Sequence, residues 1–315
     1  MIDRLGRNID YLRLSVTERC NLRCTYCCVD EGICPKAAEL SKSELIRISK
    51  ACAALGINKI RLTGGEPMLR KDIIEIVNGL SAIDGIREIT MTTNAQQLAG
   101  KAGDLKYAGL DRINISLDSL DSDKFREISG GDLGSVLSGI DEAILADLLP
   151  VKINVVLVKG INDSEVDDFI ALTKDKPIDV RFIELMPIGE LGRDDSLRVD
   201  NSKLIAARPY LKQLPPRYKS QPSSDYAVDG YEGRVGFISP ISHRFCASCN
   251  RIRVMSDGTF RPCLGDNLEI TLKDSLKAGD NELIETIRQA IYEKTSGHHF
   301  NGSFRSIRVM SSIGG

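Results

Sequence analysis

The chain has 315 residues, of which 42% are hydrophobic and 27% charged, and its formal net charge is −2. This composition is typical of a globular protein, and the near balance of charges argues against binding to nucleic acid or to a membrane surface. The longest apolar runs are too short to cross a bilayer, and the first residues lack the apolar core of a secretory signal, so we expect a cytoplasmic protein.

Short β-like runs alternate with amphipathic, helix-like segments through the first two-thirds of the chain. This alternation predicts parallel strands joined by right-handed crossovers, and therefore an α/β sheet or barrel. Ser41 and Glu44 form the capping box that marks a helix start. The predicted strands are residues 12–16, 59–62, 88–93, 112–117, 151–157 and 179–184. The predicted helices between them are residues 41–55, 71–80, 98–108, 133–147 and 164–173.

Each predicted strand has one apolar and one polar face. In the first strand, Leu12 and Leu14 alternate with Arg13 and Ser15. A closed eight-stranded barrel fills its interior with branched apolar side chains. Six strands with a polar second face indicate instead an open, curved sheet, with helices outside and a wet lumen inside. Charged groups in such a lumen need a partner, which an anionic ligand would supply.

The alternation stops after Glu184. Residues 209–222 are rich in proline, and residues 274–293 are predicted to form a helix. We therefore divide the chain into a partial barrel, residues 1–205, and a C-terminal region, residues 206–315.

The first cysteine motif follows the first predicted strand directly. Cys20, Cys24 and Cys27 lie in one short loop, and three thiolates can hold three irons of a four-iron cluster. The fourth iron is then open to a non-protein ligand. Zinc is the alternative, whereas a disulfide is not expected in a reducing compartment. Other cysteines fall outside this spacing and have no predicted role, namely Cys28, Cys34 and Cys52.

The second cysteine motif lies far down the chain, at Cys246, Cys249 and Cys263. A structural zinc site with His243 as the fourth ligand is the alternative interpretation. Arginines beside these cysteines, at positions 251 and 253, favour a cluster that binds substrate through its own open iron.

A diglycine turn ends the second predicted strand. Gly64 and Gly65 would let the backbone approach a ligand closely, and Glu66 could accept a hydrogen bond from it. A simple turn is the alternative. Polar residues also end the neighbouring strands, at 92–94, 116–118 and 184–186. In α/β barrels this rim is where ligands bind.

Together these motifs resemble the radical S-adenosylmethionine (SAM) superfamily and, within it, the GTP 3′,8-cyclase family of molybdenum cofactor biosynthesis. The Cys-x3-Cys-x2-Cys loop and the Gly-Gly-Glu-Pro turn mark the superfamily, and the second cysteine group and the diglycine end mark the family. The matching segments are residues 6–7, 11–15, 59–67, 91–94, 111–118, 181–187, 236–242 and 313–315.

The resemblance implies an incomplete six-stranded parallel (βα)6 TIM-type barrel with a C-terminal extension that carries a second iron–sulfur cluster. It implies two [4Fe–4S] clusters and SAM as cofactors, and conversion of GTP to 3′,8-cyclo-7,8-dihydro-GTP, the first step of molybdopterin biosynthesis. In this reaction a 5′-deoxyadenosyl radical removes hydrogen from ribose C3′, and the resulting carbon radical attacks C8 of guanine. The implied partners are a cellular one-electron reductant and a downstream cyclic pyranopterin monophosphate synthase, and a homodimer is compatible with the family.

The resemblance also assigns residues to roles. The two clusters would be held by Cys20, Cys24 and Cys27 and by Cys246, Cys249 and Cys263. The SAM site would contain Tyr26, Gly65, Ser116 and Met186. The GTP contacts would be Arg13, Arg61, Thr92, Lys152, Arg251, Ile252 and Arg253, and the catalytic positions Arg181, Gly314 and Gly315.

Three positions depart from the family pattern. Ala95 stands where glycine is usual, Cys28 begins a loop without the common proline, and the loop after Met186 lacks the usual tryptophan. None of these departures removes a predicted cluster ligand. A rival radical enzyme that modifies peptides would carry more C-terminal cysteines, and a zinc or electron-transfer protein is the rival from another class.

Overall fold

The computed structural model describes residues 1–27, 38–300 and 304–314. A parallel sheet built by the first two-thirds of the chain forms its centre, in strand order that follows the sequence. This arrangement confirms the predicted open α/β barrel of six parallel strands. The strands are β1 (Tyr11–Ser15), β2 (Lys59–Thr63), β3 (Glu88–Thr93), β4 (Arg112–Ser116), β5 (Val151–Leu157) and β6 (Ile178–Glu184).

The C-terminal region adds strands to both edges of this sheet. β10 (Arg251–Val254) pairs in parallel with β1, and β9 (Val235–Ile238) pairs in parallel with β6. Antiparallel strands then extend each edge: β11 (Thr259–Arg261) and β12 (Ile270–Thr271) beyond β10, and β8 (Ser224–Ala227) and β7 (Lys212–Gln213) beyond β9. The described strands form one open sheet with β12 and β7 at its ends, and the division at residue 205 stays a prediction.

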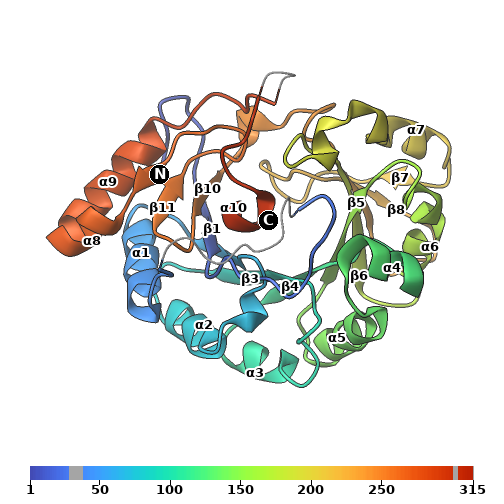
Figure 1. Cartoon of the computed structure of the whole chain (residues 1–315), viewed down its shortest axis with the longest axis horizontal. Helices are drawn as coiled ribbons and strands as arrows, with labels where there is room; N and C mark the ends of the chain where they lie inside the picture. The colour runs from blue at the N-terminus through green and yellow to red at the C-terminus, as the bar shows by residue number, and fades with distance from the viewer. Residues whose placement is uncertain (28–37, 301–303, 315) are drawn as a thin grey trace.

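Helices cover the outside of the curved sheet (Figure 1). They include α1 (Lys42–Ala54), α2 (Ile73–Ser81), α3 (Ala102–Tyr107), α4 (Ser122–Ser129), α5 (Leu133–Leu145) and α6 (Val166–Ala171), of which α4 was not predicted. The capping box at Ser41 and Glu44 is confirmed. The predicted helix 274–293 is two helices, α8 (Lys273–Ala278) and α9 (Asp280–Tyr292), because Gly279 between them has a φ of 128°. Short α7 (Asn201–Ala206) and α10 (Met310–Ile313) complete the set.

The alternation of the strands is confirmed by where their side chains lie. Leu12, Leu14, Ile113 and Ile115 are fully buried in the core between sheet and helices. The polar side chains therefore face the inside of the curve. Helix α10 lies over the centre of that curve (Figure 1).

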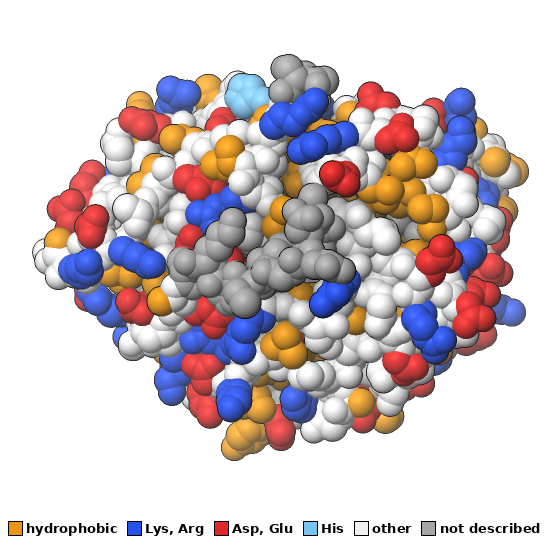
Figure 2. Space-filling view, viewed as in Figure 1, with side chains coloured by type: hydrophobic (Ala, Val, Ile, Leu, Met, Phe, Trp, Pro, Cys, Tyr) orange, Lys and Arg blue, Asp and Glu red, His pale blue; other side chains and the backbone are white. Residues whose placement is uncertain are grey.

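The surface carries no large region of one charge on the face that Figure 2 shows, where basic and acidic side chains are mixed. No helix within the described part of the chain is both long and apolar enough to span a membrane.

Candidate active site

A central cavity of about 360 Å³ opens on the inner face of the sheet. The six cysteines predicted to hold clusters all line it, although they come from two distant parts of the chain. The first three follow β1. Of the others, Cys246 and Cys249 precede β10, and Cys263 follows β11. They are Cys20, Cys24, Cys27, Cys246, Cys249 and Cys263.

The diglycine turn holds the loop that carries the first cysteines. Gly65 N donates to Thr17 O at 2.8 Å, and Glu66 N donates to Arg19 O at 2.7 Å. A Cβ on Gly65 would lie 2.6 Å from Glu18 O and would also collide with Arg19 O. The close approach that these glycines permit is thus to the cysteine loop itself, a contact that the sequence did not indicate.

Glu66 lines the cavity, but its carboxylate is used within the protein. Its Oε1 accepts from Thr93 Oγ1 at 2.6 Å and from Met68 N at 3.0 Å, and its Oε2 accepts from Asn94 N at 2.6 Å. Burial raises the pKa of Glu66, and these three hydrogen bonds oppose that shift. Glu66 therefore ties the end of β2 to the end of β3, and its contact with a ligand stays a prediction.

Three arginines lie side by side on the inner face. Arg13 is in register with Arg253 on one side and with Arg61 on the other. Burial, and then the charges of Arg253 and Arg61, hold the pKa of Arg13 well below its usual value. Burial, and then Arg251, lower the pKa of Arg253 to about 10. Because adjacent like charges destabilise a sheet, this row favours an anionic ligand that would offset the repulsion.

Polar atoms without a partner surround the same space. Among the described residues, Arg181 Nε, Thr92 Oγ1 and Asn154 Oδ1 are buried and make no hydrogen bond, and all three residues line the cavity. A buried polar atom without a hydrogen-bond partner destabilises the fold unless a ligand supplies that partner. Arg181 is fixed in place by Asn114, whose Oδ1 accepts from its Nη2 at 2.7 Å. Burial lowers the pKa of Arg181 to about 10.

Two predicted GTP contacts do not line the cavity. The side chain of Ile252 is fully buried in the apolar core on the outer face of β10. Only the main chain of Ile252 could therefore contact GTP. Lys152 lies on β5 with its Nζ 3.8 Å from Asp179 Oδ2. Burial, followed by the charges of Arg181 and Arg112, lowers the pKa of Lys152 to about 7.

The residues predicted to bind SAM come together beside the first cysteine loop. Tyr26, Gly65, Ser116 and Met186 all line the cavity. The hydroxyl of Tyr26 donates to Asp118 Oδ2 at 2.7 Å, and Asp118 Oδ1 accepts from Val156 N at 2.8 Å. Burial raises the pKa of Asp118 to about 6, against the effect of these hydrogen bonds.

A buried lysine, Lys294, and a buried arginine, Arg7, hold the second cysteine group. We predicted no role for either residue, although Arg7 lies in the segment 6–7 that matches the family. Lys294 donates from Nζ to Arg251 O at 2.9 Å and also to Pro262 O, next to Cys263. Arg7 donates to the main-chain oxygens of Cys246 at 3.2 Å and of Thr295 at 2.7 Å. Both side chains cross-link segments that are far apart in the chain.

The positive charges act on the thiols as well. Burial alone would raise the pKa of Cys249, but Arg251 and then Lys294 outweigh it and bring that pKa to about 6. The Nη2 of Arg251 lies 3.7 Å from Cys249 Sγ, and its guanidinium stacks 4.9 Å from the Phe245 ring centre. A thiol with this pKa is a thiolate at neutral pH, which is the form that binds iron.

The diglycine end reaches the arginine row. The main-chain oxygen of Gly314 accepts hydrogen bonds from Arg13 Nη2 at 3.1 Å and Arg253 Nη1 at 3.0 Å. Gly314 has a φ of 80°, in the left-handed region. Of the other predicted or unassigned positions, Gly315, Cys28 and Cys34 lie outside the described residues, and Cys52 is buried in the core.

The fourth ligand of the zinc alternative, His243, lies apart from the second cysteine group in the described structure. His243 is exposed and does not line the cavity. No described group of three His, Cys, Asp or Glu side chains is arranged to hold one metal ion. In a four-iron cube each cysteine binds a different iron, so the three ligands are spread more widely than those of a single ion. Ala95, the departure from glycine, has a φ of 60° and so keeps the backbone that glycine would favour.

Two family models together match most of the chain. The Radical SAM superfamily model matches residues 14–173, and the Molybdenum Cofactor Synthesis C model matches residues 178–300. The curated relatives named GTP 3′,8-cyclase include those of Alkaliphilus oremlandii, Clostridium acetobutylicum and Moorella thermoacetica, at 48%, 45% and 42% identity, each covering 100% of both chains.

Solved structures share the fold at low sequence identity. SuiB of Streptococcus suis superposes with a TM-score of 0.60 at 17% identity, over 82% of this chain and 61% of the SuiB chain. The structure titled native anSMEcpe with bound AdoMet gives a TM-score of 0.56 at 13% identity, over 92% of this chain and 82% of the other. These likenesses concern the fold alone.

An open parallel barrel with a three-cysteine loop after its first strand defines the class of radical SAM proteins. The curated relatives that match over their full length define the family within this class. The chain belongs to the GTP 3′,8-cyclase family of the radical SAM superfamily.

This membership implies SAM and [4Fe–4S] clusters as cofactors, with a second cluster in enzymes of this type. The residues present fit these cofactors, since both groups of three cysteines line the cavity. Arg251, Arg253 and Lys294 line it as well, near the second group. Three thiolates per site match a cube that keeps one iron for a small ligand.

Proposed function

We propose that this chain is a GTP 3′,8-cyclase that converts GTP to 3′,8-cyclo-7,8-dihydro-GTP. The observation that carries the proposal is the shared cavity, in which two cysteine trios and a row of three arginines face one space. A nucleoside triphosphate matches this lining because its phosphates are anionic and its base offers ring atoms to an open iron. Arginine forks are well suited to phosphate oxygens.

Each set of residues then has a role in the proposal. Cys20, Cys24 and Cys27 hold the first cluster, beside which Tyr26, Gly65, Ser116 and Met186 bind SAM. Cys246, Cys249 and Cys263 hold the second cluster, next to the guanine site. The proposed GTP contacts that line the cavity are Arg13, Arg61, Thr92, Arg251 and Arg253. Lys152 and the main chain of Ile252 are proposed as contacts from the family resemblance alone, and the catalytic positions are Arg181, Gly314 and Gly315.

When bound, the first cluster and SAM supply the radical that removes hydrogen from the ribose of GTP. The protein's contribution is to bind and orient. The arginine row fixes the phosphates, Arg251 lies over Phe245 near the base site, and the buried Arg181 Nε is free to donate to the substrate. The apolar and cysteine-lined walls exclude water from a reactive carbon centre.

Anaerobic incubation of the reduced, iron-loaded protein with SAM and GTP tests this proposal. We expect GTP to be consumed together with the formation of 5′-deoxyadenosine, and the cyclised nucleotide to appear by mass spectrometry. Formation of 5′-deoxyadenosine with GTP left intact would reject the cyclase assignment while keeping the radical SAM class.

Iron content adds a test of the cysteine roles. The wild-type protein should hold about eight irons, and Cys263→Ser about four, since each cube has four irons. Cys52→Ala is the matched control, because Cys52 lies on α1 away from the cavity. Equal iron in Cys263→Ser and wild type would remove Cys263 from the site.

The proposal also includes its cellular setting. We place the protein in the cytoplasm, supplied by a one-electron reductant and followed by a cyclic pyranopterin monophosphate synthase that uses its product. A homodimer is the oligomeric state to test, by light scattering of the iron-loaded protein.

A further inference from the structure

The C-terminal segment, residues 304–314, leads into the cavity and ends at the arginine row. Its last described residue, Gly314, contacts Arg13 and Arg253. The preceding helix α10 has one turn only, so its own hydrogen bonds cannot fix the position of the segment. Something outside the segment must hold it.

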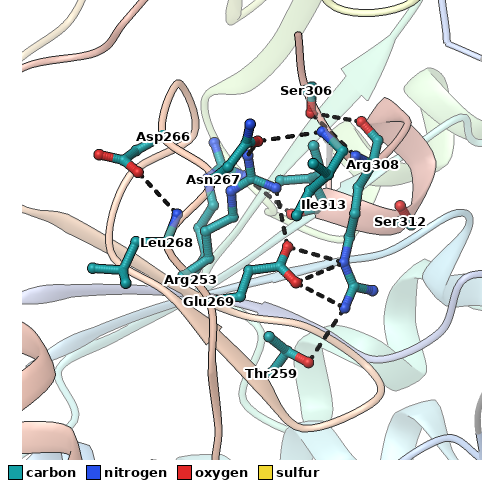
Figure 3. Close-up of polar contacts among 12 residues, drawn as sticks. Arg253, Thr259, Asp266, Asn267, Leu268, Glu269, Ser306, Arg308, Ser312 and Ile313 are labelled. Atoms are coloured by element: carbon teal, nitrogen blue, oxygen red, sulfur yellow. Dashed lines mark hydrogen bonds and ion pairs between the residues drawn. The ribbon is translucent and has the colours of Figure 1, made fainter.

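Arg308 is the main polar anchor of this segment (Figure 3). Its Nε lies 3.0 Å from Glu269 Oε1, and its Nη2 lies 3.1 Å from Glu269 Oε2, which makes a bidentate pair. Its Nη1 lies 3.0 Å from Asp257 Oδ2 and 3.7 Å from Glu18 Oε1. The side chains of all four residues are less than a quarter exposed, so water screens these charges less than at an open surface.

These acidic partners come from loops next to both cysteine groups. Glu18 precedes Cys20 by two residues and belongs to the stretch that packs on the diglycine turn. Glu269 lies after Cys263 and also accepts from Arg261 Nη1 at 3.2 Å. The fully buried Arg261 in turn donates from Nε to Cys263 O at 3.2 Å.

A second contact fastens the main chain of the segment to the same loop. Asn267 Nδ2 donates to Arg305 O at 2.8 Å, and Asn267 Oδ1 accepts from Ile307 N at 3.2 Å and from Arg261 Nη2 at 3.2 Å. Asn267 and Glu269 thus share Arg261 as their support (Figure 3 shows Asn267 and Glu269 facing the segment).

We propose that Arg308 and Glu269 are positioning residues, which dock the C-terminal segment onto the two cysteine loops and so place Gly314 at the arginine row. A hydrogen-bonded chain runs from the Cys263 loop through Arg261 and Glu269 to Arg308. The segment docks fully only when the loops on both sides of it are in place. The role in turnover rests on the proposed function, whereas the docking itself does not.

Hydrogen–deuterium exchange of peptides from residues 304–314, in the iron-loaded full chain, tests the docking. We expect Arg308→Ala and Glu269→Gln to speed exchange of this segment by roughly 10-fold or more, since hydrogen bonds to charged groups contribute most when they are bidentate and partly buried. The exchange rate of Arg308→Lys should lie between those of Arg308→Ala and wild type, because an ammonium keeps the positive charge but cannot make the bidentate pair with Glu269.

Arg288→Ala is the matched control, because Arg288 forms an exposed pair with Glu285 on α9. Its exchange in residues 304–314 should equal that of wild type. Wild-type exchange in both Arg308→Ala and Glu269→Gln would overturn the proposal, as would equal acceleration in Arg288→Ala. If Arg308→Ala does not fold, Glu269→Gln and Asp257→Asn decide the matter by the same measurement.

GTP turnover of the same variants separates the two proposals. GTP turnover that falls in the same order as the exchange rate of residues 304–314 rises supports a positioning role for Arg308 and Glu269. Fast exchange with no GTP turnover even in wild type would keep the docking but reject the proposed function.

Discussion

The Nη2 atom of Arg13 donates a hydrogen bond of 3.1 Å to the main-chain oxygen of Gly314, which lies 301 residues further along the chain. Arg253 donates to the same oxygen. A neutral carbonyl uses only one of the five N–H groups of each guanidinium and cancels neither charge. These two hydrogen bonds hold the end of the C-terminal segment against the arginine row on the inner face of the sheet.

Gly314→Ala should weaken this contact. A side chain at a φ of 80° is strained by about 1–2 kcal/mol, and the added Cβ would lie 2.6 Å from Thr63 Oγ1. We expect GTP turnover to fall by roughly 10-fold, in line with that strain, while iron content stays at the wild-type value. Single-turnover product analysis and iron assay would measure the two effects.

Gly160→Ala is the control for Gly314→Ala. Gly160 has a φ of 77°, but a Cβ there meets nothing within 4 Å. This variant should lose a comparable amount of stability and keep full turnover. Equal loss of turnover in both variants would show that strain alone, and not the position of Gly314, explains the result.

The barrel and its lumen could be predicted from local alternation. Leu12 and Leu14 point to the core and Arg13 to the cavity because side chains alternate along a strand, whatever their distant neighbours are. The cysteine trios were recognisable for the same reason, since their spacing is local.

Long-range contacts could not be predicted in this way. β10 lies beside β1 although the two strands are far apart in the chain, and β7 and β12 have only two residues each, too few for a pattern. Arg7, Lys294 and Arg308 are single basic residues, and the residues beside them show no pattern that would indicate a buried partner. Nothing local separates such residues from solvated charges, and only the fold shows that each one bridges distant main-chain segments.

Gly65→Ala should displace the first cysteine loop. The new Cβ would collide with the main-chain oxygens of Glu18 and Arg19, which directly precede Cys20. Backbone cannot yield as a flexible side chain does, so we expect the first cluster to be lost and iron to fall from about eight to about four per chain. Gly103→Ala on α3 is the control, since its Cβ meets nothing and alanine favours helix. Full iron content in Gly65→Ala would contradict the prediction.

Lys294→Met should alter the second cluster. Lys294 is almost fully buried, with its ammonium on Arg251 O and Pro262 O beside two cysteines. Loss of one nearby positive charge disfavours the reduced cluster, so the reduction potential should fall, by on the order of 100 mV for a charge within the first layer of protein around a cluster. An anaerobic redox titration followed by electron paramagnetic resonance would measure it. The exposed Lys277→Met should leave the potential unchanged, and an unshifted potential in Lys294→Met would refute the proposed charge effect.

Lys152→Met should change how stability depends on pH. The pKa of Lys152 is lowered to about 7 in the folded protein, by burial first and then by Arg181 and Arg112. The unfolded lysine, with its ordinary pKa of about 10.4, binds more protons between these two values, so stability of the ligand-free protein should rise with pH from about 7 to about 10. Methionine keeps the apolar stem and removes the proton, so Lys152→Met should be more stable near pH 7 by up to on the order of 4 kcal/mol and should lose this rise. Denaturant midpoints at several pH values would measure both changes, with the exposed Lys176→Met as control. If the stability of Lys152→Met rose with pH as steeply as that of wild type, the pH dependence would belong to another group.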